Sequence, residues 1–138
     1  MGPISNREYF MKYVAPHIDN RQIIYLGEVS FKTKVDYLSR AKALLYPVQY
    51  DEYFGVAMIE ALACGTPVIG FARGSVTEII RHGINGYLVN NIDDAINAVE
   101  KIDNINPRIV REDAEERFSA EVFARKYLNI YMRMLDER

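Results

Sequence analysis

The stretch ALLYPVQYDEYFGVAMIEALACGTPVIGF, residues 43–71, contains two short aliphatic runs separated by a segment of helical length. The runs at 43–47 and 67–71 are rich in aliphatic and aromatic side chains, which is typical of buried strands. Between them, residues 54–64 have the composition of a helix, and Gly65 is a common helix-ending residue. The stretch therefore predicts two strands joined by a helix, the repeating unit of an α/β fold.

The same alternation extends in both directions from this stretch. Further strands are expected at 22–26 and 85–89, and helices at 6–15, 31–41, 76–83, 92–103, 107–117 and 119–136. A capping box of Ser75 and Glu78 is expected to start the helix at Val76. Because the strands are apolar and separated by helices, they should form a parallel sheet with helices on both faces. The sequence predicts a single Rossmann-like three-layer α/β domain over residues 1–138, with about four parallel strands and a long C-terminal helix.

Composition and charge disfavour several classes of protein. Of the 138 residues, 49% are hydrophobic, which is ample for one packed core. A net charge of −2, without long runs of like charge, disfavours binding to nucleic acid or an anionic membrane. The lone Cys64 and two distant histidines offer neither a disulfide nor metal-ligand spacing. We see no signal peptide and no run long enough for a membrane span, so a soluble, cytoplasmic protein is expected.

The loop that follows the strand at 43–47 is the first candidate for ligand binding. In parallel α/β sheets, ligands bind at the carboxyl ends of the strands. Amides at a helix N-terminus attract anions, and a glycine lets a ligand oxygen approach the backbone closely. A phosphate-bearing ligand would therefore fit the first amides of the next helix, which belong to Phe54, Gly55 and Val56.

Glu60 places a carboxylate in an otherwise apolar helical segment. Its burial without hydrogen-bond donors would cost on the order of several kcal/mol, so the side chain should have partners. Vicinal hydroxyls, such as those of a ribose, supply two donors to one carboxylate, as in dinucleotide-binding folds. The alternative is that Glu60 faces solvent or pairs with a nearby lysine or arginine.

The order and spacing of several motifs add a resemblance to a known family. Glu52 and Glu60 have seven residues between them, and Gly65-Thr66-Pro67-Val68 follows. Further on, Gly74-Ser75 precedes Glu78. This block resembles the C-terminal, nucleotide-sugar-binding half of retaining glycosyltransferases of GT-B architecture, in particular the family-4 type. The resemblance covers roughly residues 1–90, and the rest of the chain matches only in its helical character.

The resemblance implies a role for each glutamate. Glu60 would bind the ribose hydroxyls of the donor. Glu52 would contact the transferred sugar and organise charge at its anomeric centre, which makes it the candidate catalytic residue. Sugar hydroxyls and phosphate oxygens would be held by the amides of Phe54, Gly55 and Val56.

Further implications concern the base and the diphosphate of the donor. The turn at Gly27, Glu28 and Val29 would lie against the base. No metal or other cofactor is expected, because helix ends and basic side chains neutralise the diphosphate in this family. Tyr53 departs from the pattern, which usually has a proline at this position and therefore a stiffer loop.

The resemblance also implies that this chain is an incomplete donor-binding half, truncated at its N-terminal side. The family's donor domain opens with a strand and a glycine-rich loop that carries an arginine and a lysine, and the match to this chain begins after both. The strands at 22–26 and 43–47 should then pair directly or leave edges for another chain to cover. The expected partners are a nucleotide sugar and either a second copy of the chain or a missing N-terminal domain.

The resemblance therefore implies the donor-binding domain of a glycosyltransferase that transfers a hexosyl group with retention to an unknown acceptor, inactive on its own. One alternative is a non-catalytic binding or regulatory module that docks to a partner chain. Another is a fragment of a related sugar-nucleotide epimerase or phosphorylase.

Overall fold

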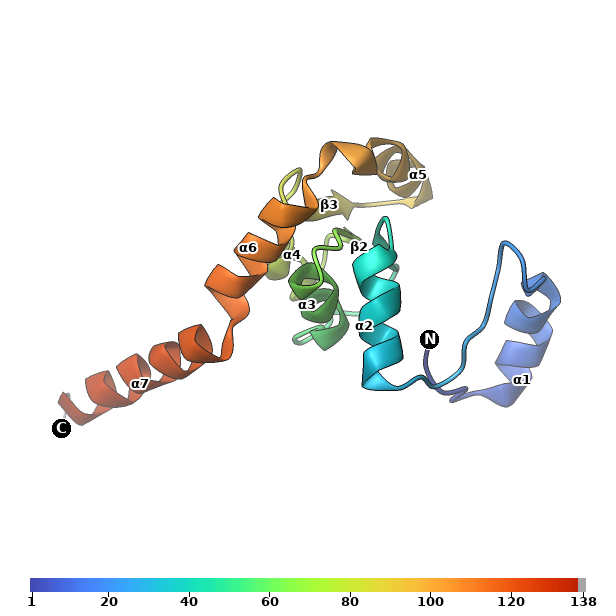
Figure 1. Cartoon of the computed structure of the whole chain (residues 1–138). Coiled ribbons are helices and arrows are strands. Elements are labelled where there is room, and N and C mark those ends of the chain that lie inside the picture. The colour runs from blue at the N-terminus through green and yellow to red at the C-terminus, as the bar shows by residue number, and fades with distance from the viewer. Residues whose placement is uncertain (137–138) are drawn as a thin grey trace. The chain divides into compact units, whose positions relative to one another are not determined.

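The computed structural model describes residues 1–136 and divides the chain into two compact units, residues 1–37 and residues 38 onward (Figure 1). The boundary falls inside the helix α2 (Phe31–Arg40). Ser30 caps this helix, because its hydroxyl accepts a hydrogen bond from the amide of Thr33 at 3.2 Å. The helix predicted at 31–41 is thereby confirmed.

The first unit begins with a short helical segment. It consists of α1 (Arg7–Tyr9), a π-helical turn (Phe10–Val14) and a 3₁₀ turn (Ala15–His17). Asn6 caps the segment, since its side chain accepts a hydrogen bond from the amide of Tyr9 at 2.9 Å. A helix predicted at 6–15 is present, although its hydrogen bonding is irregular.

The strand predicted at 22–26 is wrong, because these residues form no strand in the structure. One carboxylate oxygen of Asp19 accepts hydrogen bonds at 2.9, 2.8 and 2.8 Å from the amides of Arg21, Gln22 and Ile23. Amides engaged by a side chain in this way are not available to a strand ladder. The run is apolar as expected, but the turn at Asp19 takes the amides of its first two residues, Gln22 and Ile23.

The second unit contains a parallel sheet of three strands, β1 (Leu44–Tyr46), β2 (Val68–Phe71) and β3 (Gly86–Val89), with β2 in the middle. Tyr46 is in register with Gly70, and Phe71 with Val89, so the carboxyl ends of the strands meet at one edge. The α/β fold with a parallel sheet is confirmed, with three strands instead of about four. Within the described residues β1 pairs with β2 alone, so direct pairing of 22–26 with 43–47, one of the two expected alternatives, does not occur, whereas the other alternative, an edge that another chain covers, stays a prediction.

Helices cover both faces of this sheet. The helix α3 (Val56–Ala63) packs against β1, β2 and α6 (Pro107–Phe118), whereas α5 (Ile92–Lys101) packs against β2 and β3. Figure 1 shows α5 on the opposite side of the strands from α3, which confirms the three layers. The largest fully buried apolar side chains lie between these elements: Met58, Leu62, Val68, Val76 and Val110.

The remaining elements follow α5. A 3₁₀ turn (Ile102–Asn104) connects it to α6, and α6 is followed by α7 (Ala120–Asp136), which confirms the long C-terminal helix. The helix α7 has no buried residue, although Phe123, Tyr127 and other apolar side chains lie along it. Across residues 1–136, we find no helix with both the length and the apolar character needed to cross a bilayer.

The helix α4 (Val76–Ile79) begins where the sequence predicts and ends four residues before Gly83. Asn85 accounts for the early end, because its side chain accepts a hydrogen bond from the amide of Arg81 at 2.8 Å and donates one to the carbonyl of Ile79 at 3.1 Å. The expected capping box is wrong. The buried hydroxyl of Ser75 makes no hydrogen bond within the described residues.

Candidate functional site

Glu52 lies in the loop that leaves the carboxyl end of β1, and three groups donate hydrogen bonds to its carboxylate. The hydroxyls of Tyr46 and Tyr50 donate to Oε2 at 2.9 and 3.2 Å. The amide of Tyr53 donates to Oε1 at 3.0 Å. The strand therefore supplies one donor and the loop two, which together orient this side chain at the carboxyl edge of the sheet.

These contacts change the acid–base properties of both partners. The hydrogen bond from Tyr46, with those from the backbone amides of Phe54 and Tyr53, lowers the pKa of Glu52 below its ordinary value. Burial, followed by the hydrogen bond to Glu52, raises the pKa of Tyr46 to about 12. At neutral pH Glu52 is thus an ionised carboxylate that accepts the hydrogen bond, and Tyr46 is a neutral phenol that donates it.

The backbone of Glu52 is held by the segment Gly74–Ser75, which joins β2 to α4. The amide of Ser75 donates a hydrogen bond to the carbonyl of Glu52 at 2.9 Å. Gly74 has a φ of +49°, and a Cβ at this position would lie 2.7 Å from both the amide nitrogen and the carbonyl oxygen of Glu52. Only glycine fits this close approach. The structure therefore brings together two motifs that are separated by more than 20 residues in the sequence.

The predicted anion-binding amides lie directly after Glu52. Gly55 has a φ of 73° and a ψ of 56°, a left-handed conformation that suits glycine, and it occupies the cap position of α3. The amide of Phe54 contributes to the lowered pKa of Glu52, so it is directed at that carboxylate. Val56 is the first residue of α3, and its side chain is exposed. Binding of a ligand by these amides stays a prediction.

Glu60 lies on α3, one turn after Val56, and its side chain is partly buried. The helix that carries it begins immediately after the loop of Glu52, so both glutamates belong to the same loop–helix segment of the second unit. The role of Glu60 toward a ribose stays a prediction.

Gly27, Glu28 and Val29 lie in the first unit. Gly27 has a φ of +63°, and its carbonyl accepts a hydrogen bond from the amide of Gly2 at 2.8 Å. The chain bends at Glu28, and the predicted contact of this segment with a base stays a prediction.

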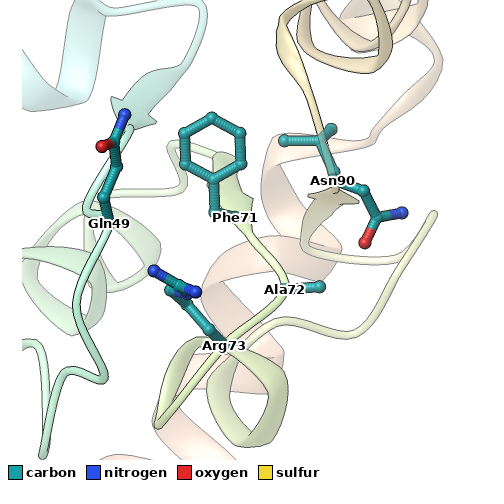
Figure 2. A pocket seen from close by; sticks show the side chains of 6 residues that line it. Gln49, Phe71, Ala72, Arg73 and Asn90 are labelled. Carbon is teal, nitrogen blue, oxygen red and sulfur yellow. The ribbon is translucent and has the colours of Figure 1, made fainter.

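A cavity of about 360 Å³ opens at the carboxyl ends of the strands (Figure 2). Gln49 follows β1, Arg73 follows β2 and Asn90 follows β3, and all three contribute to its lining. Arg73 also lies 3.9 Å from the carboxylate of Asp51. The sequence analysis did not identify Gln49 or Asn90, although each lies within three residues of the end of a strand, which was a usable signal.

Across residues 1–136 no group of three or more histidine, cysteine, aspartate or glutamate side chains is arranged to hold a metal ion. The expectation that no metal is needed stays a prediction.

Comparison with known proteins places this geometry in context. The family model described as glycosyl transferases group 1 matches residues 3–117. N-acetyl-alpha-D-glucosaminyl L-malate synthase of Bacillus anthracis is 32% identical over 128 residues, covering 86% of this chain and 32% of that protein. The chain thus spans about a third of that relative's length.

Solved structures agree with this match. A glycosyltransferase involved in avilamycin A biosynthesis superposes with a TM-score of 0.79 at 24% identity, covering 99% of this chain and 43% of that one. HepE from Anabaena, in complex with UDP and glucose, superposes with a TM-score of 0.77 at 18% identity, covering 96% and 39% of the two chains. At these identities the likeness concerns the fold. Because the family model covers most of its length, the chain belongs to the glycosyl transferases of group 1.

Proposed function

We propose that this chain is the nucleotide-sugar donor-binding domain of a glycosyltransferase, with Glu52 as the residue that contacts the transferred sugar. The observation that carries the proposal is the Glu52 carboxylate, which is fixed by Tyr46 through its side chain and by Ser75 through its backbone at the carboxyl edge of the sheet. Family membership supports it. So does the complex of HepE with UDP and glucose, a protein of the same fold.

The lowered pKa of Glu52 suits this role. Glycosyl transfer passes through a transition state with positive charge at the anomeric carbon and ring oxygen, as glycoside hydrolysis does. A preoriented carboxylate stabilises such charge without first having to reorganise. The lowered pKa keeps the Glu52 carboxylate ionised at neutral pH and further into acid than an ordinary glutamate. We propose that the reaction retains the configuration of a hexosyl group.

The start of α3 is proposed to hold the rest of the donor. The left-handed cap at Gly55 turns the chain into the helix, where the first amides and the positive end of the helix attract phosphate oxygens. Glu60 would bind the ribose hydroxyls one turn later. The donor would then lie along one continuous segment, from sugar at Glu52 to ribose at Glu60.

We propose that sugar transfer requires a longer protein, in which this domain is combined with a site for the acceptor. A transferase must place acceptor and donor against each other, and this chain spans about a third of its relative's length. We expect the isolated 138 residues to bind a donor weakly, with a Kd on the order of 1 mM, and to show no turnover. A regulatory module that docks to a partner would bind no nucleotide sugar in the same titration.

A titration with two ligands tests the assignment of Glu60. The isolated chain is titrated with UDP and with 2′-deoxy-UDP and followed by NMR. Glu60→Gln should weaken UDP binding severalfold and 2′-deoxy-UDP binding much less, because the lost acceptor served the ribose hydroxyl. Glu100→Gln, on the exposed face of α5, is the matched control and should leave both affinities unchanged.

Two outcomes would contradict this assignment. Equal losses for UDP and 2′-deoxy-UDP would show that Glu60 does not read the ribose. A Glu60→Gln variant that is more stable than the parent, with unchanged UDP binding, would show that the carboxylate destabilises the fold and has no role in binding the ribose.

A further inference from the structure

A charged cluster lies at the C-terminal end of α4, at a distance along the chain from every predicted site residue. The carboxylate of Asp113, on α6, is only 4% exposed. It accepts hydrogen bonds at 2.6, 2.7 and 2.9 Å from the side chains of Arg81, Asn85 and Arg117. A buried carboxylate needs such partners, so this cluster has one defined arrangement.

Arg117 connects the cluster to α4. Its guanidinium donates to the carbonyl of Ile79 at 2.9 Å and to the carbonyl of Glu78 at 2.5 Å. Carbonyls at the end of a helix have no partner within the helix, and a positive charge there is favourable to the helix dipole. Arg117 therefore holds the C-terminal end of α4 while Asp113 holds Arg117.

The opposite end of α4 touches the site. Ser75, which precedes the helix, donates its amide to the carbonyl of Glu52, and Gly74 lies directly against the backbone of Glu52. The helix has only four residues, too few to be stable without outside contacts. Val76 and Ile79 pack its inner face into the core, and polar contacts hold its two ends: the Glu52 loop on one side, and Arg117 together with Asn85 on the other.

We propose that Arg117 is a positioning residue for Glu52, acting through α4. It touches neither a donor nor a reacting atom; it holds the end of the helix whose N-cap residue, Ser75, donates its amide to the Glu52 carbonyl. The effect of Arg117 on Glu52 is inferred from the contacts above. Its importance for donor binding rests on the proposed function. Chain order alone hides this link, because Arg117 and Glu52 are far apart in the sequence.

The test uses Arg117→Lys, which keeps the positive charge beside Asp113 but lacks the planar fork that reaches two carbonyls. Its matched control is Arg111→Lys on the same helix, where the native guanidinium pairs with Glu115 in an exposed i,i+4 contact. Both variants are prepared as the whole 138-residue chain with isotope labels for NMR. Hydrogen exchange of the Ser75 amide and the pKa of the Glu52 carboxyl are measured in each.

If Arg117 positions Glu52, Arg117→Lys speeds exchange of the Ser75 amide by roughly tenfold or more relative to core amides of β2. The pKa of Glu52 rises toward its ordinary value as the carboxylate loses its orientation toward Tyr46. Arg111→Lys changes neither. If instead Ser75 and the β2 amides accelerate equally, or the pKa of Glu52 does not move, Arg117 has a general structural role and the inference is overturned.

Two further variants keep the result decisive. If Arg117→Lys does not fold, Asp113→Asn replaces it, because it removes the charge that orients Arg117 and keeps the side-chain shape. Glu52→Gln tests the proposed function separately by UDP-glucose titration. Unchanged donor binding in Glu52→Gln would end the proposed role of Glu52, while the Ser75 and Glu52 measurements would still decide the role of Arg117.

Discussion

Gly74→Ala is the substitution that most directly tests the contact between the two motifs of the site. The residue has a φ of +49°, where an alanine costs about 1–2 kcal/mol relative to glycine. The new Cβ would also lie 2.7 Å from both the amide nitrogen and the carbonyl oxygen of Glu52. Both are backbone atoms, so relief requires movement of the Glu52 loop. Such overpacking adds a further 1–3 kcal/mol, roughly.

Gly83→Ala is the matched control, because Gly83 also has a positive φ of +79° and a Cβ there would meet nothing within 4 Å. The two variants share the conformational cost, so their difference isolates the contact with Glu52. Urea unfolding should show Gly74→Ala to be less stable than Gly83→Ala by about 1–3 kcal/mol. In Gly74→Ala alone, the pKa of Glu52 should rise toward its ordinary value. Equal losses of stability in the two variants would refute the reasoning.

Two other substitutions test contacts within the second unit. Tyr46→Phe should raise the pKa of Glu52, because the hydroxyl is the first cause of its depression, and a pH titration by carbon NMR measures it. The lowered pKa of Glu52 stabilises the fold at pH values above the pKa of this group in the unfolded chain, and this stabilisation is lost in acid. The raised pKa of Tyr46 stabilises the fold below pH 10, and this stabilisation is lost as the pH approaches about 12. The stability gap between parent and Tyr46→Phe should thus be widest near neutral pH and shrink in acid, and a gap that stays the same from neutral pH into acid would contradict this linkage. Asn85→Ala should cost about 3 kcal/mol in urea unfolding, because this fully buried amide bonds to Asp113, Ile79 and Arg81, whereas Asn104→Ala on the surface should stay within about 0.5 kcal/mol.

The sequence predicted the fold where a regular pattern determines it. Two short aliphatic runs around a helical segment correctly indicated parallel strands, and the resemblance to GT-B glycosyltransferases is confirmed by the family match and the fold neighbours. Its assignment to the family-4 type stays a prediction. At 22–26 a local contact works against a strand, since the carboxylate of Asp19 takes the amides of Gln22 and Ile23.

Other features depend on contacts that no periodicity encodes. The S-x-x-E pattern at Ser75 is common at helix starts. Here, however, the amide of Ser75 donates a hydrogen bond to the carbonyl of Glu52, and its buried hydroxyl caps nothing within the described residues. The early end of α4 is decided by Asn85, six residues after the last residue of the helix. Arg117 binds carbonyls 38 and 39 residues away, so its role could be seen only once the chain was folded.

The contact between Gly74–Ser75 and Glu52 has a consequence for how this site can change. Both segments meet through main-chain atoms, and the side chain at position 52 takes no part in that contact. The main chain at position 52 is therefore held separately from the hydrogen bonds that orient its carboxylate. A substitution of Glu52 removes the carboxylate and leaves the main-chain contact in place, whereas a substitution of Gly74 displaces the loop itself.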